Sequence, residues 1–213
     1  MLRVAIEVVV LLIGVSLHES AHGWVAFRCG DRTAHDLGRI SLNPIRHLDP
    51  FGSVLLPILL AVSGAPVFGW AKPVPVSLRG VPHPRRANLL VAAAGPLSNL
   101  LLAAVAALAL RYGPLPVWFG AHVDGLSRVV ILLAISAVVV NASLAVFNLL
   151  PIPPLDGFGV LESLLPARLR PLTLWLRRYG MIIFLLAIMT GALRNLMVPI
   201  QRTVVLWLLG AHR

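Results

Sequence analysis

Charged residues are scarce in this sequence. Asp, Glu, Lys and Arg make up 12% of it and only eight residues are acidic, whereas soluble globular domains carry about 25% charged residues. Hydrophobic residues make up 58%, and the mean hydropathy is +0.89. These values exclude a water-soluble globular domain and indicate an integral membrane protein.

Cysteine is almost absent as well, since Cys29 is the only one. A single cysteine excludes an intrachain disulfide, and we interpret Cys29 as a small buried or loop thiol. No cleavable signal peptide is evident, because the apolar stretch after Arg3 is long enough to span a membrane. Without internal repeats or low-complexity tails, we expect one transmembrane domain over residues 1–213, with a core at 4–160 and C-terminal helices at 172–210.

The net charge of +10 comes from 18 Lys and Arg residues. A strongly basic chain can indicate nucleic-acid binding, but here the arginines cluster in short loops between apolar segments. That distribution is the positive-inside pattern of multi-pass membrane proteins. We therefore expect a lipid bilayer, and no nucleic acid, as the partner of this charge.

Apolar segments of about 20 residues can span a membrane. The segments of this length are 4–27, 87–110 and 129–150. The segment 51–65 is shorter and contains Pro57 and Gly64, which favours a re-entrant or surface-embedded segment. The C-terminal third holds either one broken helix or two short ones. The predicted fold class is an all-α, polytopic transmembrane helical bundle with about four to six membrane segments.

Residues 18–22 read His18-Glu19-Ser20-Ala21-His22 within the first apolar segment. In a helix, His18 and His22 lie one turn apart on one face, and this spacing suits two nitrogen ligands of a tetrahedral zinc ion. Glu19 lies at the edge of that face, where it can take a proton from a water without being a ligand. Ionisable groups in a membrane segment are costly and mark function. The alternative is a buried histidine pair with a structural role.

Catalytic zinc has three protein ligands and one open position, so a third ligand must come from elsewhere. Asp156 is the best candidate, because it follows the span 129–150 within a proline-rich turn that ends in Gly157. The prolines stop the helix, and Gly157 allows an unusual turn. Irregular backbone at membrane depth must face protein or a water-filled cavity. The alternative is an ordinary helix-stop loop with a solvated aspartate.

The histidines lie near the C-terminal end of one span, and Asp156 lies just beyond the C-terminal end of another. To meet at one depth, these spans must run in the same direction, with an odd number of complete crossings between them. The span 87–110 supplies one crossing, so the segment 51–65 should not cross fully. Four basic residues lie in each of the loops 28–50, 66–86 and 168–178, against two in the loop 111–128. The positive-inside rule then places the N-terminus outside and the zinc site toward the cytoplasmic face.

Three motifs occur in the order His18-Glu-Ser-Ala-His22, Gly95-Pro-Leu-Ser-Asn99 and Asn148-x-x-Pro-x-Pro-x-Leu-Asp156-Gly157. Together they resemble the site-2 protease family of intramembrane zinc metalloproteases. The stretch from Phe68 to Val76 also resembles the membrane-associated loop of compact prokaryotic members. No stretch between the last two motifs is long enough for a PDZ domain, and we expect no nucleotide-binding domain after the last helix. The resemblance is therefore to a compact member.

The resemblance implies one zinc ion per chain, bound by His18, His22 and Asp156, with Glu19 as general base. It also implies that Asn148 holds the substrate carbonyl or its oxyanion, a role that suits an amide donor. The alternative for Asn148 is an interhelical hydrogen bond.

For Asn99 we expect a structural role. Small residues at Gly95 and Ser98 would let two helices pack closely, and the amide of Asn99 would bridge them.

Residues 72–77 alternate proline and valine, which suits an edge strand better than a helix. Because a substrate helix must unwind before it is cut, such a strand could pair with the unwound segment by β-augmentation. We therefore expect a short, membrane-associated, β-like loop. The alternative is an amphipathic surface loop.

The sequence thus favours an intramembrane zinc endopeptidase that hydrolyses peptide bonds in or near transmembrane segments, in regulated intramembrane proteolysis or signal-peptide clearance. Without an organellar targeting pattern, we expect a prokaryotic plasma membrane. One alternative is a non-enzymatic zinc-binding membrane scaffold or metal carrier. Glu19 argues against it, since a structural site does not need this carboxylate. Another alternative is a peptidase for soluble substrates whose site opens to the cytoplasm.

Overall fold

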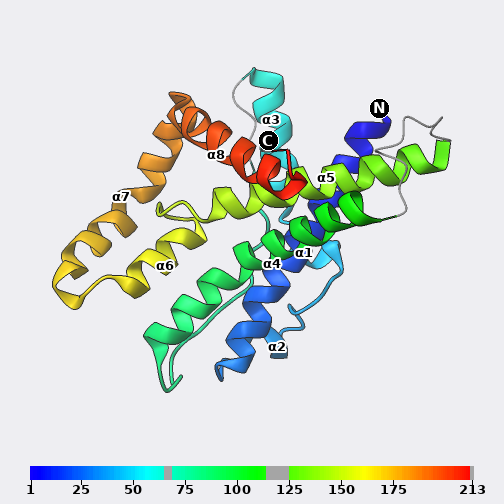
Figure 1. The fold of residues 1–213 in the computed structure, drawn as a ribbon. Coiled ribbons are helices and arrows are strands. Elements are labelled where there is room, and N and C mark those ends of the chain that lie inside the picture. The colour runs from blue at the N-terminus through cyan, green and yellow to red at the C-terminus, as the bar shows by residue number, and fades with distance from the viewer. Residues whose placement is uncertain (65–68, 114–124, 212–213) are drawn as a thin grey trace.

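The computed structural model describes residues 1–64, 69–113 and 125–211, in which every regular element is a helix (Figure 1). The elements are α1 (Leu2–Arg28), α2 (Thr33–Asp36), η1 (Pro44–His47), η2 (Pro50–Leu55), α3 (Leu56–Ser63), α4 (Pro84–Tyr112), α5 (Gly125–Asn148), α6 (Asp156–Leu164), η4 (Ala167–Leu169), α7 (Arg170–Met189) and α8 (Ala192–Leu209). Phe68 and most of the predicted loop 111–128 lie outside the described residues.

Four helices are long and apolar enough to cross a membrane. They are Leu2–Arg28, Pro84–Tyr112, Gly125–Asn148 and Ala167–Met189. The 27 residues of α1 extend about 40 Å at the usual helical rise, which exceeds the about 30 Å of a hydrocarbon core. The predicted fold class, an all-α polytopic transmembrane bundle, is therefore confirmed.

The short apolar segment forms two consecutive helical pieces. The π-helical η2 has six residues and α3 has eight, so together they extend about 21 Å. This is less than the hydrocarbon thickness of a bilayer, as expected for a segment that does not cross fully. In Figure 1, α3 projects from the bundle.

The C-terminal third contains two helices rather than one broken helix. Gly191 separates α7 from α8 with a φ of +74°, a left-handed conformation that glycine adopts at little cost. Leu150 and Leu155, which flank the turn after α5, pack against Phe184 of α7 and Met197 of α8. The C-terminal helices therefore support the turn that leads to Asp156.

Helices α1, α4 and α5 pack against one another to form the centre of the bundle. Their contact faces are lined with small residues, of which Ala26, Ala103, Ala142 and Ala145 are at most 1% exposed. Small side chains let helices approach closely in a bilayer, where burial from water gives no driving force for association. Larger apolar side chains such as Leu101, which is 66% exposed, point outward, as lipid contact requires.

The three central helices have the relative directions that the motifs predict. Figure 1 shows α1 and α5 running the same general way, with α4 returning between them in the sequence. One crossing thus brings the end of α5 to the part of α1 that carries the histidines. The short α6 is fastened to α4 by the Asn88 side-chain amide, which donates to the Gly159 carbonyl (3.1 Å) and to the Ser163 hydroxyl (2.8 Å).

A glycine is needed at position 157 for a different reason from the one that the sequence suggested. The expectation of an unusual turn is wrong, because Gly157 lies in α6 and is not among the glycines with positive φ. Instead, a Cβ at this position would overlap with the carbonyl of Leu149. Gly157 therefore provides space where α6 folds back against the end of α5.

We predict that Gly157→Ala lowers the free energy of unfolding by about 1–3 kcal/mol, because overpacking must displace backbone rather than a flexible side chain. Gly125→Ala is the matched control, since a Cβ at Gly125 meets no atom of the described residues within 4 Å. Thermal or denaturant unfolding in detergent micelles measures both variants. Equal stability of the two variants would contradict this role for Gly157.

Candidate metal centre

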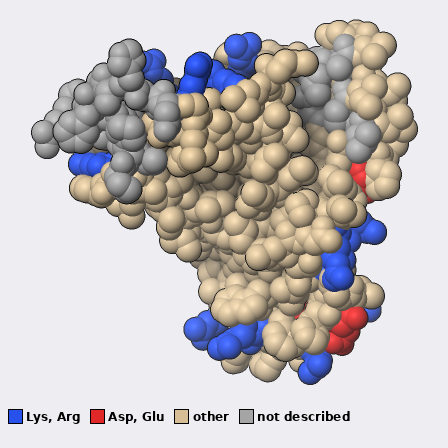
Figure 2. Space-filling view, turned by 90° about the vertical axis from the view of Figure 1, so that its right-hand side faces the viewer, with Lys and Arg blue, Asp and Glu red and all other residues tan. Residues whose placement is uncertain are grey.

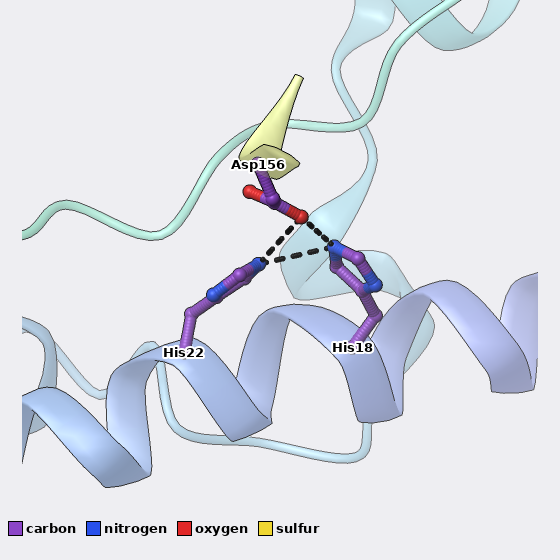
Figure 3. A group of neighbouring side chains, drawn as sticks. All are labelled: His18, His22 and Asp156. Atoms are coloured by element: carbon purple, nitrogen blue, oxygen red, sulfur yellow. Dashed lines mark hydrogen bonds and ion pairs between the residues drawn. The ribbon is translucent and has the colours of Figure 1, made fainter. Parts of the chain in front are cut away.

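Three side chains converge between α1 and the start of α6 (Figure 3). Nε2 of His18 lies 3.0 Å from Nε2 of His22, and Oδ2 of Asp156 lies 3.0 Å from the first nitrogen and 3.3 Å from the second. The structure thus brings together His18, His22 and Asp156, the three ligands expected from the sequence, and their donor atoms could hold one metal ion.

The distances fit a tetrahedral zinc site. Zinc binds histidine nitrogen and carboxylate oxygen at about 2.0–2.2 Å, so two ligand atoms at tetrahedral angles lie about 3.3–3.6 Å apart. The observed separations of 3.0 to 3.3 Å are slightly shorter and need only a small expansion. Moreover, Oδ2 of Asp156 is buried and has no hydrogen-bond donor among the described residues. A buried carboxylate oxygen without a donor is costly, and a cation would satisfy it.

Both histidines are oriented through their other ring nitrogen. Nδ1 of His22 lies 2.6 Å from the carbonyl oxygen of Val91, and Nδ1 of His18 lies 2.6 Å from Oδ1 of Asn99. A carbonyl oxygen only accepts, so Nδ1 of His22 carries the hydrogen and Nε2 of the neutral ring presents its lone pair. Such outer contacts orient metal-binding histidines.

Helix α4 meets the histidines with residues spaced four apart. Val91, Gly95 and Asn99 form one stripe along this helix, which faces His22 and His18 in antiparallel register. Gly95 lies between the two contacts, and a Cβ there would overlap with Nε2 of His22 and lie 2.6 Å from Nε2 of His18. The absence of a side chain at Gly95 therefore makes room for the imidazoles and for an ion between them.

Asp156 is the first residue of α6, directly after the loop that ends α5. The N-terminus of a helix favours a negative charge, and the Asp156 side chain is 23% exposed. The alternative of a solvated aspartate in a helix-stop loop does not fit this position, because the carboxylate points at the two histidines (Figure 3).

Glu19 lies half-buried beside the cluster and is held by a loop. Its Oε2 accepts a hydrogen bond of 2.8 Å from the backbone N–H of Val74. Val74 is 8% exposed, and a Cβ at Gly23 would lie 3.2 Å from its side chain. The loop therefore packs on α1 one turn beyond Glu19 and fixes one oxygen of this carboxylate.

Residues 69–78 have no regular secondary structure, so the alternative left open for 72–77 resolves to a loop rather than a strand. Side chains of the preceding region hold this loop. Arg39 donates to the Lys72 carbonyl at 2.8 Å, and the Ser77 N–H donates to Oδ2 of Asp31 at 2.6 Å. The loop is thereby tied to the segment that follows α1.

Asn148 is not joined to the cluster by any hydrogen bond that the structure describes. Its Nδ2 donates to the Leu144 carbonyl of its own helix at 3.0 Å. The interhelical hydrogen bond considered as the alternative is therefore not formed by this donor.

Asn99 bridges helices as expected, but Gly95 does not serve the close packing of two helices that was expected of it. The amide of Asn99 donates to the Gly14 carbonyl of α1 at 3.0 Å and to Oδ1 of Asn141 in α5 at 2.9 Å. Gly95 makes room for histidine rings rather than for a helix backbone. The contacts of Val91 and Asn99 with the histidines, and that of Asn141 with Asn99, were not predicted. The four-residue spacing of Val91, Gly95 and Asn99 was the available signal.

A family model described as "Peptidase family M50" matches residues 6–191. The chain therefore belongs to peptidase family M50, the site-2 protease family of zinc metalloproteases. The resemblance drawn from the three motifs is confirmed.

Curated relatives agree with this assignment. A Bacillus subtilis protein named "Putative zinc metalloprotease YwhC" is 42% identical over 188 residues, which cover 86% of this chain and 80% of the relative. A protein named "Putative zinc metalloprotease Rip2" is 32% identical over 186 residues in Mycolicibacterium smegmatis, covering 86% of this chain and 66% of the relative. Its namesake in Mycobacterium tuberculosis is 36% identical over 165 residues, covering 76% and 56%. No solved structure shows a significant match.

We predict that Gly95→Ala weakens zinc binding by on the order of tenfold or more, because the new methyl group must displace both imidazoles. Competition with a chromogenic chelator in detergent measures the affinity. Gly125→Ala, which places the same methyl group in open space, should bind zinc like the wild type. Wild-type affinity in Gly95→Ala would show that α4 does not approach the histidines this closely.

The tie between Asp31 and the loop should depend on pH. Burial acts to raise the pKa of Asp31, but hydrogen bonds from the Thr33 hydroxyl, the Thr33 N–H and the Ser77 N–H outweigh it and lower the pKa. A carboxylate with a lowered folded-state pKa stabilises the fold above its unfolded value of about 3.9, and this stabilisation is lost as the pH falls through the folded-state pKa.

We therefore predict that the Ser77 amide is protected from hydrogen exchange at neutral pH and loses protection as the pH falls below about 4. Protection factors corrected for the intrinsic exchange rate measure this. In Asp31→Asn the protection should be weaker at neutral pH and independent of pH in this range. The same pH dependence in wild type and Asp31→Asn would assign it to another group.

Proposed function

We propose that this protein is an intramembrane zinc endopeptidase that hydrolyses peptide bonds in or near transmembrane segments of membrane proteins. The observation that carries the proposal is the convergence of His18, His22 and Asp156 within an apolar bundle, with Glu19 adjacent in sequence to one of the histidines. A structural zinc site needs four closed ligands, whereas three ligands leave a position open for a reaction.

In this proposal His18, His22 and Asp156 hold one zinc ion per chain. Zinc bound there supplies a Lewis acid that polarises a peptide carbonyl and lowers the pKa of a water. Because the Nδ1 atoms are engaged by Val91 and Asn99, the rings are held with both Nε2 atoms directed toward Oδ2 of Asp156.

Glu19 is proposed as the general base. One of its oxygens is held by the Val74 N–H, which leaves Oε1 to accept a proton from the attacking water. The water oxygen adds to the carbonyl carbon, the C–N bond breaks, and Glu19 passes the proton to the leaving nitrogen. One water is consumed, and a carboxylic acid and an amine are formed, which ionise to a carboxylate and an ammonium group.

Asn148 is proposed to hold the substrate carbonyl or its oxyanion. An amide nitrogen has two hydrogens, and the bond to the Leu144 carbonyl uses one of them. The second hydrogen remains for an oxygen of the substrate, whose developing charge a preorganised donor stabilises.

The proposed location is a prokaryotic plasma membrane, with the site toward the cytoplasmic side. His22 and His18 lie six and ten residues before Arg28, the last residue of α1, which is about 9 and about 15 Å along the helix axis. Arg85 and Arg86 begin α4 at the same end, and the positive-inside rule assigns a basic end to the cytoplasm. Figure 2 shows Lys and Arg near the upper and lower ends and along the right-hand edge of one face, with a broad uncharged middle that suits lipid.

The proposed substrates are helices that unwind before they are cut. The loop at residues 69–78 contacts Glu19 through Val74, so a substrate segment beside this loop would lie close to the base. We also propose that the core 4–160 and the C-terminal helices 172–210 act as one domain, since α7 and α8 support the turn before Asp156.

The test is Glu19→Gln, which keeps the size of the side chain and removes its basicity. We predict unchanged zinc content and a loss of cleavage of about 10²–10⁴-fold. Cleavage is measured by mass spectrometry of transmembrane peptides reconstituted in vesicles with the purified protein. Full activity in Glu19→Gln would remove Glu19 as the base.

The same assay separates the alternatives. A scaffold or metal carrier would bind zinc in both forms and cleave nothing in either. A peptidase for soluble substrates would cut a soluble peptide as fast as the same sequence embedded in a membrane. Ser98→Ala is the control variant, because among the described residues the Ser98 hydroxyl bonds only the Gly95 carbonyl of its own helix.

A further inference from the structure

We propose that Asn99 and Asn141 form a buried relay that fixes the tautomer of His18, so that its Nε2 always presents a lone pair to the metal. The inference rests on the proposed function, since it assigns positioning residues to the same zinc site. The relay runs across three helices, from the backbone of α5 through α4 to the histidine on α1.

The relay begins at a group whose role is fixed. Nδ2 of Asn141 lies 2.9 Å from the carbonyl oxygen of Ala137. A carbonyl oxygen can only accept, so the amide of Asn141 must turn its nitrogen toward Ala137. Oδ1 of Asn141 then faces α4 as an acceptor.

Asn99 has no choice of orientation between these partners. One side of its amide meets two acceptors, the Gly14 carbonyl at 3.0 Å and Oδ1 of Asn141 at 2.9 Å. Both hydrogens of Nδ2 are used there. A flipped amide would point an oxygen at two oxygens, so the network itself assigns nitrogen and oxygen. Oδ1 of Asn99 must therefore face His18.

The consequence reaches the ring of His18. Oδ1 of Asn99 is an acceptor 2.6 Å from Nδ1 of His18, so Nδ1 carries the hydrogen. In a neutral imidazole the other nitrogen is then unprotonated. The tautomer that binds metal through Nε2 is thus selected before any ion arrives.

Burial of the two asparagines strengthens the selection of this His18 tautomer. Asn99 and Asn141 are both fully buried, with 0% exposure, so solvent cannot replace a missing partner. Leaving a buried polar group unpaired is costly. Gly14 allows the side chain of Asn141 to approach α1 closely, since a Cβ at position 14 would lie 2.6 Å from Oδ1 of Asn141.

The two histidines differ in this respect. His22 is fixed by a backbone carbonyl, that of Val91, and no substitution removes that acceptor. His18 is fixed by a side chain, so substitution of Asn99 can release its tautomer. A role limited to bridging helices predicts no such link between Asn99 and metal affinity.

The test compares Asn99→Leu with Asn99→Asp. Leucine is similar in size but accepts no hydrogen bond, whereas aspartate keeps an oxygen that faces Nδ1 of His18. Aspartate, however, places its other oxygen against the Gly14 carbonyl and Asn141, which weakens the bridge between helices. Ser16→Ala is the matched control, since Ser16 is 1% exposed on α1 and bonds only the Leu12 carbonyl of its own helix.

We expect the zinc affinity, measured by chelator competition in detergent, to fall by about 10–100-fold in Asn99→Leu. Asn99→Asp should bind like the wild type despite a lower melting temperature, and Ser16→Ala should also bind like the wild type. Asn141→Leu should cause a smaller loss, and the double variant Asn99→Leu/Asn141→Leu should bind no worse than Asn99→Leu, because Asn141 acts through Asn99. Wild-type affinity in Asn99→Leu, equal losses in the leucine and aspartate variants, or additive losses in the double variant would overturn the relay.

A second measurement keeps the test independent of variants that fail to fold and of zinc binding itself. In zinc-free wild-type protein labelled with 15N-histidine, at about pH 8 where a free imidazole is neutral, the protonated and lone-pair nitrogens have widely separated shifts. The signals of His18 are those absent from His18→Gln. A hydrogen on Nδ1 supports the relay, and a hydrogen on Nε2 overturns it. Absence of zinc binding in the wild type would overturn the proposed function, while this spectrum would still decide the relay.

Discussion

Three atoms that can each donate an electron pair, Nε2 of His18, Nε2 of His22 and Oδ2 of Asp156, lie 3.0–3.3 Å from one another at the centre of this molecule. When both rings are neutral and their Nδ1 atoms donate to the Val91 carbonyl and to Asn99, both Nε2 atoms present lone pairs to the carboxylate of Asp156. Like partial charges at 3.0–3.3 Å in an apolar bundle repel strongly, because little solvent screens them. A cation at their centre would turn this repulsion into coordination, and the surrounding helices hold the three side chains in positions that suit it.

The fold supplies each donor by a different device. Helix α1 supplies two histidines through its own periodicity. Helix α4 crosses in antiparallel register. Its Val91 carbonyl contacts His22, the side-chain amide of Asn99 contacts His18, and Gly95 between them leaves space for both rings. Helix α5 then returns in the direction of α1, and the turn after it delivers Asp156 at the same depth. Because α6 is fastened to α4 and the turn is packed against α7 and α8, the carboxylate is held by the whole bundle.

The parts of this arrangement that were predictable from sequence are local ones. The spacing of His18 and His22, the prolines before Asp156 and the number of crossings between them follow from helix geometry and backbone chemistry. The outer contacts were not predictable in the same way. A backbone carbonyl such as that of Val91 has no side chain to mark it, and the register of α4 against α1 depends on packing over many residues. Gly95 and Gly157 were recognised as special, but a sequence does not say whether a ring, a carbonyl or a helix will approach a glycine.

The central claim is that His18, His22 and Asp156 hold one zinc ion. The most direct test is the metal content of the detergent-purified protein after zinc is supplied and excess is removed, measured beside His22→Ala. The account predicts about one zinc per chain in the wild type and loss of that zinc in the variant, with both proteins folded by circular dichroism. No zinc in folded wild-type protein, or full zinc content in His22→Ala, would contradict it.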